Sequence, residues 1–274
     1  MPELPEVETV KESLKQKLIG KKIKQVNVYY DNIIEYPDVN NFCNLIKEQT
    51  IKNIARYGKW LIFELDSDYL LSHLRMEGKY FFRFPQEIRN KHEHVVFSLN
   101  DGTELRYMDV RKFGKMHLIK KDEIDKKGPL LSMGLEPWDK KLTKEYLKNK
   151  YINKKIPIKT ALLDQSIIVG IGNIYADEIL FLSNINPLKS SQSLTDNDLN
   201  NIIKYTKEVL EKAIKKGGTT IRSYTSVNGV HGLFQQELYV HNQQGNKCQI
   251  CQTDIIKIKV GGRGTYYCPH CQKD

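Results

Sequence analysis

Four of the five cysteines stand close together near the end of the sequence. They form two Cys-x2-Cys pairs, Cys248 with Cys251 and Cys268 with Cys271, separated by sixteen residues. Each pair can offer two thiolates from a tight turn, and a hairpin in the spacer would bring the pairs together. Four thiolates close a tetrahedral Zn²⁺ site with no open position, so the spacing predicts one structural zinc ion. A ribbon of this kind occurs in many nucleic-acid proteins and selects no function.

The spacer between the cysteine pairs contains an arginine among glycines. The segment Gly261-Gly262-Arg263-Gly264 lies where the hairpin should turn, and its glycines let another backbone come close. From this pattern alone, Arg263 is also compatible with an ordinary solvated turn. Because four thiolates fill the zinc shell, we expect the nearby His241 and His270 to make hydrogen bonds and not to bind the metal.

The charge of the chain indicates a class of partner. Lysine and arginine total 43 against 33 acidic residues, a formal net charge of +10. This surplus favours a polyanion, with nucleic acid ahead of an anionic membrane surface. No apolar run is long enough to span a bilayer, and the N-terminus does not resemble a secretory signal. We therefore expect no membrane partner and a cytoplasmic protein with reduced cysteines.

The first half of the chain predicts one helix followed by strands. Pro5 fits a first helical turn, Gly20 ends the helix, and an apolar stripe joins Val7, Val10, Leu14 and Leu18. Candidate strands are residues 23–29, 60–65, 69–74, 79–84, 94–99, 104–107 and 115–119. Asn100-Asp101-Gly102 is a hairpin signal between two of them. Many short strands after a single helix predict a β-sandwich.

The pattern becomes helical after Gly128 to Gly134, where we place the domain boundary. Helices are expected at residues 143–150, 157–164, 175–182 and about 196–216. Thr195 should cap the last of these, with Asp198 three residues on and Gly217 as the stop. The sequence therefore predicts an α+β protein with a β-sandwich domain at 1–130, a helical domain at 135–230 and a zinc ribbon at 235–274.

Short blocks along nearly the whole chain resemble the formamidopyrimidine-DNA glycosylase family. The first is Pro2-Glu3-Leu4-Pro5-Glu6, which continues to residue 10. The others, in the family's order, are residues 56–59, 73–78, 91–95, 109–114, 163–165, 169–175 and 217–222, and the cysteine ribbon. The resemblance implies a helix-two-turn-helix domain after the sandwich. It also implies excision of oxidised purines (8-oxoguanine and formamidopyrimidines) from duplex DNA, followed by β,δ-elimination of the strand.

Four catalytic residues are implied by this resemblance. Once Met1 is removed, Pro2 is a secondary amine that can attack the sugar C1′ and form a Schiff base. Glu3 would give a proton to the ribose ring oxygen and later shuttle protons during elimination. Lys59 would contact the phosphate of the target nucleotide and assist proton transfer, and Arg263 would serve the second elimination. By pattern alone, Pro2 is a residue that begins a helix and Lys59 a solvated lysine at a strand end.

The resemblance also implies how the chain holds DNA. Met76 would enter the void left by the extruded base, Phe113 would wedge between base pairs, and Arg111 would pair with the orphaned cytosine. By pattern alone, Met76 and Phe113 are more often core residues. Phosphate contacts are implied for His92, Lys155 and Asn173. Asn173 follows two glycines at an expected helix start, where backbone N–H groups bind anions.

The resemblance also implies a set of residues that contact the damaged base itself. Those that would face the extruded base are Glu6, Glu77, Thr219, Thr220 and Tyr224. Glu6 is also compatible with a role in complementing the helix dipole. Leu4 resembles the guanine-directed branch of the family, because the endonuclease VIII branch, directed at oxidised pyrimidines, usually has glycine there.

Several positions depart from the family's usual pattern. Val110 and Lys112 stand where a proline and often an arginine occur, and Gln252 stands where glycine is common. The segment His241-Asn242-Gln243 replaces tyrosine–glycine–arginine. These departures concern local loop geometry and damage preference, and none falls on a residue with an implied catalytic role.

The sequence thus predicts a bifunctional DNA glycosylase and lyase. We expect it to act on damaged double-stranded DNA as a monomer, with one structural Zn²⁺, in the cytoplasm at the nucleoid. One alternative is an endonuclease VIII-like glycosylase for oxidised pyrimidines. Another is a non-catalytic zinc-ribbon DNA-binding protein, which would explain the charge and the cysteines but not the N-terminus.

Overall fold

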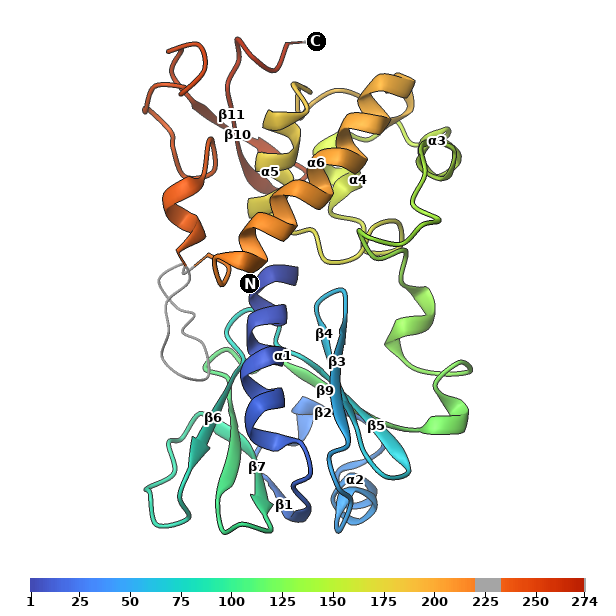
Figure 1. The fold of residues 1–274 in the computed structure, drawn as a ribbon, viewed down its shortest axis with the longest axis vertical. Coiled ribbons are helices and arrows are strands. Elements are labelled where there is room, and N and C mark those ends of the chain that lie inside the picture. The colour runs from blue at the N-terminus through green and yellow to red at the C-terminus, as the bar shows by residue number, and fades with distance from the viewer. Residues whose placement is uncertain (220–232, 274) are drawn as a thin grey trace. The chain divides into compact units, whose positions relative to one another are not determined.

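The chain folds into two units in the computed structural model, which describes residues 1–219 and 233–273 (Figure 1). The first unit contains Met1–Pro2 and Glu6–Leu131, and the second contains Glu3–Pro5, Ser132–Thr219 and the chain from Leu233 onward. Each unit has its own apolar core. Among the described residues, no helix has the length and apolar character needed to cross a membrane.

Two β-sheets and two helices make up the first unit. The four-stranded sheet has the order β1 (Ile23–Val28), β7 (Glu93–Leu99), β8 (Glu104–Met108) and β6 (Lys79–Arg83). The five-stranded sheet has the order β2 (Ile34–Tyr36), β9 (Lys115–Lys120), β5 (Asp68–His73), β4 (Trp60–Glu64) and β3 (Asn53–Tyr57). Neighbouring strands are antiparallel except β2 and β9. The helices are α1 (Leu4–Leu18) and α2 (Val39–Ile46).

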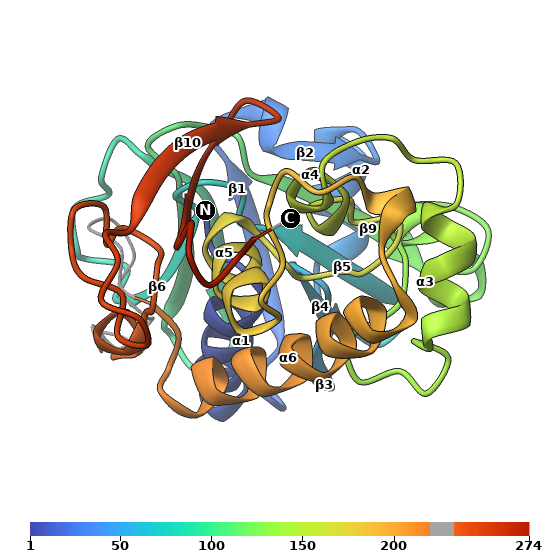
Figure 2. The same cartoon turned by 90° about the horizontal axis from the view of Figure 1, so that it is seen from above.

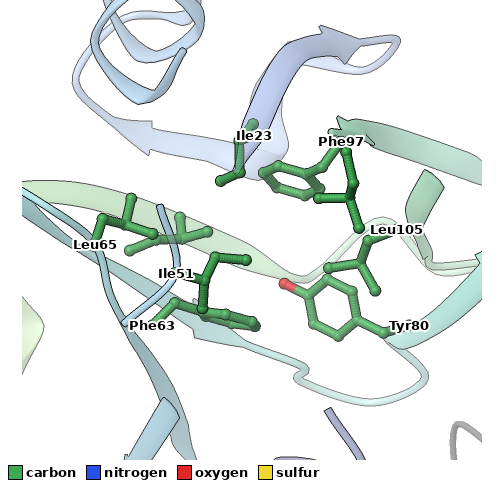
Figure 3. Close-up of a pocket in the computed structure, with 9 residues that line it drawn as sticks. Ile23, Ile51, Phe63, Leu65, Tyr80, Phe97 and Leu105 are labelled. Atoms are coloured by element: carbon green, nitrogen blue, oxygen red, sulfur yellow. The ribbon is translucent and has the colours of Figure 1, made fainter. Parts of the chain in front are cut away.

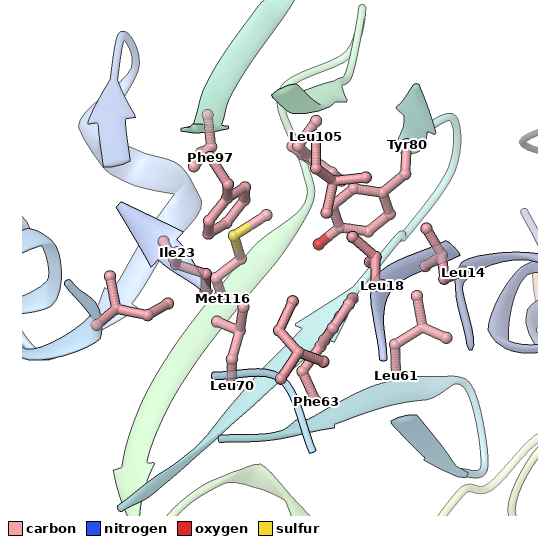
Figure 4. Packing of buried hydrophobic residues seen from close by; sticks show 14 of the residues in the cluster. Leu14, Leu18, Ile23, Leu61, Phe63, Leu70, Tyr80, Phe97, Leu105 and Met116 are labelled. Carbon is pink, nitrogen blue, oxygen red and sulfur yellow. The ribbon is translucent and has the colours of Figure 1, made fainter. Parts of the chain in front are cut away.

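Both sheets and helix α1 contribute to one core, as a sandwich requires. Leu14 and Leu18 of α1 lie in the same cluster as Phe63 of one sheet and Phe97 of the other (Figure 4). Packing leaves a cavity of about 10 Å³ lined by apolar side chains, among them Tyr80 (Figure 3). A space of this size and polarity is a packing defect and not a ligand site.

The predicted elements of the first unit are present. Each predicted strand corresponds to one observed strand, with ends that differ by at most about one residue. The hairpin at Asn100-Asp101-Gly102 joins β7 and β8. Strands β2 and β3 and helix α2 were not predicted.

The second unit is helical and ends in a β-hairpin. Its helices are α3 (Lys144–Tyr151), α4 (Ile158–Leu162), α5 (Asn173–Leu182) and α6 (Asp196–Lys215). Helix α5 packs against α6 and against strand β11 (Arg263–Tyr267), which pairs with β10 (Ile256–Val260) (Figure 2). Short 3₁₀ turns complete the described elements, at Asp31–Ile33, Lys121–Glu123, Pro129–Ser132, Ser191–Ser193 and Phe234–Glu237.

Helix boundaries in the second unit follow the sequence signals. The predicted cap of α6 is confirmed as a full capping box, because Thr195 Oγ1 accepts from Asp198 N at 3.1 Å and Asp198 Oδ2 accepts from Thr195 N at 2.9 Å. Helix α5 begins two residues earlier than predicted, at Asn173. Within the described part of the ribbon, the regular strands are those of the β10–β11 hairpin, which lies in the spacer between the two cysteine pairs as predicted.

Candidate functional site

The carboxylate of Glu3 lies at the N-terminus of helix α5. Its Oε2 accepts hydrogen bonds from Gly172 N at 2.7 Å and Tyr175 N at 3.3 Å, and its Oε1 accepts from Ile174 N at 2.9 Å. These N–H groups are the donors that a helix start leaves without intrahelical partners, and the helix dipole also favours an anion there. Glu3 is buried, so its two oxygens are held in a fixed orientation.

The glycines before α5 allow this contact. A Cβ on Gly172 would overlap the Glu3 carboxyl group, and a Cβ on Gly170 would overlap the Leu4 side chain. Leu4 N also donates to the carbonyl of Gly170 at 3.1 Å. Gly170 has φ +91°, which favours glycine, whereas Gly172 has an ordinary φ of −125°. Glycine is therefore required at position 172 because any side chain there would occupy the space of the Glu3 carboxylate.

Asn173, expected to contact a phosphate, is the first residue of α5. The sequence suggested that the N-terminus of α5 binds an external phosphate, whereas in the structure the anion at this position is the Glu3 carboxylate. The Nδ2 of Asn173 donates to the carbonyl oxygen of Gly264 at 2.9 Å. One hydrogen of that amide is thus already used, and a phosphate contact from Asn173 remains a prediction.

Arg263 begins strand β11, directly after a two-residue turn. Gly261 (φ +53°) and Gly262 (φ +78°) form the turn, and Arg263 pairs with Val260. Two left-handed residues in sequence are typical of the tight hairpin turn that matches strand twist. The Arg263 side chain is exposed, while the Asn173–Gly264 hydrogen bond ties the residue after it to α5. Glu3 and Arg263 are thus both connected to the first residues of α5.

The four cysteines of the ribbon form the structural zinc site. Their sulfur atoms all lie within 4.8 Å of one another, with Cys248 and Cys271 at 3.8 Å and Cys251 and Cys268 at 3.4 Å. Zn–S bonds of about 2.3 Å in a tetrahedron place sulfur atoms roughly 3.8 Å apart, so the donor set fits Zn²⁺. It is the one cluster of three or more candidate ligands within residues 1–219 and 233–273.

Of the two histidines near the ribbon, His241 makes the polar contact expected of it. His241 Nδ1 lies 2.7 Å from Asp177 Oδ2, and His270 is exposed. Asp177 also pairs with Lys159, whose Nζ donates to the carbonyl of Asn173 at 2.7 Å. Burial lowers the pKa of Lys159, while Asp177 and Glu3 oppose that shift.

Sequence reasoning missed these buried charges around α5. Glu178, the neighbour of Asp177, accepts from the backbone N–H groups of residues 239, 240 and 241 at 2.8 to 3.0 Å and so fixes the chain leading into the ribbon. Burial raises the pKa of Glu178. The signal was available, because an Asp-Glu pair inside an otherwise apolar helix must face partners in the interior.

Met76, Arg111 and Phe113 lie on two turns of the first unit. Phe113 is 50% exposed and Arg111 is exposed, which contradicts the core interpretation of Phe113. The Arg111 guanidinium lies 4.9 Å from the centre of the Phe113 ring. Met76 is half-buried in the turn after β5. An exposed aromatic ring beside a cation is suited to contact with nucleobases.

Asp109 fixes the turn that carries Arg111 and Phe113. Its Oδ1 accepts from Arg111 N at 3.0 Å, and its Oδ2 accepts from Phe113 N at 2.9 Å and Gly114 N at 2.8 Å. The carboxylate is fully buried, so it belongs to the turn and not to the surface. Lys112, in the middle of the turn, has φ +58°.

The remaining candidates of the first unit lie mostly inside it. Lys59 is 4% exposed, in the turn between β3 and β4, which contradicts the solvated interpretation. Pro2 and Glu6 are buried, and Glu77 is half-buried. His92 is half-buried, and its backbone N–H donates to Asn90 Oδ1 at 2.9 Å.

In the second unit, Lys155 is exposed in the loop between α3 and α4, and Thr219 is buried. Thr220 and Tyr224 lie outside the described residues. Of the candidate residues, the structure therefore brings together Glu3, Asn173 and Arg263 in one unit, and Arg111 with Phe113 in the other.

Three family models match successive parts of the chain. Residues 1–116 match the formamidopyrimidine-DNA glycosylase N-terminal domain, and residues 133–225 match the H2TH domain of the same family. Residues 245–273 match a zinc finger found in FPG and IleRS. The chain belongs to the formamidopyrimidine-DNA glycosylase family.

Full-length relatives agree with this assignment. The formamidopyrimidine-DNA glycosylase of Oceanobacillus iheyensis is 50% identical over 99% of this chain and 98% of its own length. That of Shouchella clausii is 48% identical over 99% of both chains. The fold prediction is thereby confirmed: an N-terminal β-sheet domain with a leading helix, an H2TH helical domain and a four-cysteine zinc finger.

Solved structures of Lactococcus lactis Fpg are similar throughout. The complex with DNA containing an abasic site has a TM-score of 0.92 at 38% identity and covers 99% of this chain and all of the other. A point variant of that protein, in complex with DNA containing Fapy-dG, has a TM-score of 0.93 at the same identity over the full length of both chains. The same protein was also solved with DNA containing an oxidised pyrimidine.

Proposed function

We propose that the chain is a bifunctional DNA glycosylase and abasic-site lyase that removes oxidised purines from duplex DNA. The observation that carries the proposal is the Glu3 carboxylate, which three backbone N–H groups hold in place next in sequence to Pro2. Membership in a family of such glycosylases over the full length supports it.

The proposed reaction begins at the nitrogen of Pro2. After Met1 is removed, this amine attacks C1′, the bond from C1′ to the base breaks, and the base leaves with a proton. Glu3 protonates the ribose ring oxygen as the ring opens, and an iminium forms between Pro2 and C1′. Loss of a C2′ proton then expels the 3′ phosphate, and a second elimination, served by Arg263, expels the 5′ phosphate. Lys59 contacts the phosphate of the target nucleotide and assists proton transfer.

Binding of damaged duplex DNA is assigned to three sets of residues. Met76, Arg111 and Phe113 fill the space that the extruded base leaves, a role supported by the exposure of Arg111 and Phe113. His92, Lys155 and Asn173 contact phosphates. The residues that face the base are Glu6, Glu77, Thr219, Thr220 and Tyr224.

We further propose that the chain acts as a monomer in the cytoplasm, at the nucleoid. Its working parts are the sandwich domain (1–130), the helical domain (135–230) and the ribbon (235–274). The formal net charge of the whole chain, +10, supports a polyanionic binding partner.

The test compares wild type and Glu3→Gln on three duplexes that contain 8-oxoguanine opposite cytosine, an oxidised pyrimidine, or an abasic site. We expect wild type to excise 8-oxoguanine and to cut the strand, and Glu3→Gln to bind the same duplex without excision. Excision by Glu3→Gln at the wild-type rate would contradict the role of Glu3. Absence of any cutting by wild type would favour the passive DNA-binding alternative.

The oxidised-pyrimidine duplex tests the second candidate function. The solved complex of the Lactococcus lactis protein with DNA containing an oxidised pyrimidine gives this candidate specific support. Faster excision of the pyrimidine than of 8-oxoguanine would favour an endonuclease VIII-like preference over the proposed one.

A further inference from the structure

Met76 and Phe113 are carried by two turns with similar backbone features. The turn after β5 is closed by a hydrogen bond from Gly78 N to Leu74 O at 2.9 Å, and Arg75 within it has φ +52°. The turn after β8 has Lys112 at φ +58° between Arg111 and Phe113. Left-handed residues other than glycine cost free energy and persist where the surroundings impose them, often at functional sites. The surroundings of each turn in the first unit must therefore impose its conformation.

The hydroxyl group of Tyr107 lies against both turns. Tyr107 is fully buried near the end of β8. A Cβ on Gly78 of the first turn would overlap the Tyr107 hydroxyl oxygen, and a Cβ on Gly114 of the second turn would overlap the same atom. The hydroxyl thus occupies the space that the two glycines leave open. It contacts the backbone of one turn on each side.

Tyr107 also reaches the anchor of the second turn. Its hydroxyl donates to Asp109 Oδ2 at 3.5 Å, the oxygen that accepts from Phe113 N and Gly114 N. The Tyr107 ring packs against the Tyr80 ring, with ring centres 5.2 Å apart in an edge-to-face arrangement. A rigid ring therefore places one oxygen between the two turns.

We propose that Tyr107 is a positioning residue that holds the two turns relative to each other, so that Met76 and Phe113 enter the opened base stack together. The inference rests on the proposed function, in which these side chains enter the duplex. Without the hydroxyl, atoms of both turns lose contacts on one side, and each turn can shift independently. Insertion between stacked bases requires placement to within about 0.5 Å, so independent shifts impair capture of the lesion.

The chain offers a matched control in Tyr80. Its side chain is also buried, belongs to the same aromatic pair, and donates its hydroxyl to Ser72 Oγ at 2.7 Å. Tyr107→Phe and Tyr80→Phe each remove one buried hydroxyl from a pair of neighbouring rings. Of these two hydroxyls, that of Tyr107 is the one that lies against Gly78 and Gly114 of the two turns. Thermal unfolding of both variants reports the loss of stability that any buried hydroxyl would cause.

The experiment measures single-turnover excision of 8-oxoguanine and the fluorescence of 2-aminopurine placed beside the lesion. We expect Tyr107→Phe to lower the excision rate and the fluorescence change several-fold, and Tyr80→Phe to leave both near wild type. Cutting at an abasic site in single-stranded DNA, where no stack is opened, should be unchanged in both variants. Wild-type capture by Tyr107→Phe, or equal loss in Tyr80→Phe, would overturn the inference.

A second comparison separates this inference from the proposed function. In a Met76→Ala/Phe113→Ala background, adding Tyr107→Phe should cause little further loss, because the side chains through which it acts are gone. A further several-fold loss there would show that Tyr107 acts by another route and would overturn the inference alone. If Met76→Ala/Phe113→Ala itself captures the lesion as wild type does, the proposed insertion role fails, and this inference fails with it.

Discussion

Gly172 lies directly against the carboxylate of Glu3. Its N–H donates to Glu3 Oε2 at 2.7 Å, and a Cβ at this position would overlap the carboxyl carbon. The φ of Gly172, −125°, suits any residue, so an alanine here would meet a steric obstacle and no backbone strain. This position therefore allows the Glu3 contact to be disturbed without a change at Glu3.

We predict that Gly172→Ala displaces the Glu3 carboxylate from the N-terminus of α5. Excision of 8-oxoguanine should fall at least about tenfold, which corresponds to about 1.4 kcal/mol in the barrier. The loss should resemble that of Glu3→Gln, and adding Gly172→Ala to Glu3→Gln should change little. Single-turnover rates of the three variants give the answer, and a wild-type rate in Gly172→Ala would contradict the importance of this placement.

A second prediction concerns stability at mildly acidic pH. Burial, followed by Arg75 and Lys59, lowers the pKa of His73 to about 3, and its Nδ1 accepts from Arg75 N at 2.9 Å. Between about pH 3 and the usual histidine pKa of about 6.5, the unfolded chain binds more protons at this residue, so stability falls as the pH is lowered through this window.

From about pH 7.5 to about pH 5.5, His73 should account for a loss of about 1.4 kcal/mol in the free energy of unfolding. Urea unfolding at the two pH values measures it. His73→Asn should show a smaller loss than wild type. Equal pH dependence in His73→Asn and wild type would show that His73 is not the responsible group.

The zinc site leads to a prediction with an internal control. Cys268→Ser should release about one zinc ion per chain, lower the melting temperature and weaken DNA binding, since a structural metal supplies folding energy. Cys43→Ser, which alters the one cysteine outside the cluster, should retain the metal. Metal analysis of the purified variants measures the zinc content per chain. A fully active protein without zinc would refute a structural role of the metal.

Gln252 stands where the family commonly has glycine, and its φ is +62°. Replacing it by glycine should remove the strain of a left-handed side chain and stabilise the protein by about 0.5–1 kcal/mol. Gln252→Ala keeps a Cβ and should leave the melting temperature near that of wild type. Asn242, at φ +62°, should gain less on change to glycine, because asparagine tolerates this conformation. A lower melting temperature for Gln252→Gly would contradict this explanation.

The predictable parts of the fold were those with local signals. Strands such as β7 follow from alternation and a turn sequence, α6 from its stripe and cap, and the zinc site from cysteine spacing. Strand β2 was missed because it has three residues and pairs in parallel with β9, a relationship set by tertiary contacts. Helix α2 was missed although Asp38 caps it, accepting from Asn41 N at 3.0 Å.

The site was less predictable than the fold. Residue types and family likeness indicated Glu3, but the hydrogen bonds that hold it come from Gly172, Ile174 and Tyr175, which lie far along the chain. Likewise, nothing in the sequence shows that Tyr107 lies between two glycines, because their separations in the chain carry no periodic signal. Such contacts depend on how the elements pack.

The role of Pro2 as the nucleophile is tested by locating the covalent adduct. Wild-type protein is incubated with a duplex containing 8-oxoguanine, reduced with borohydride, digested and analysed by mass spectrometry. We expect one DNA adduct per chain, on the peptide that begins with Pro2, in protein that has lost Met1. An adduct on a lysine such as Lys59, or efficient strand cutting with no trapped adduct, would contradict Pro2 as the nucleophile.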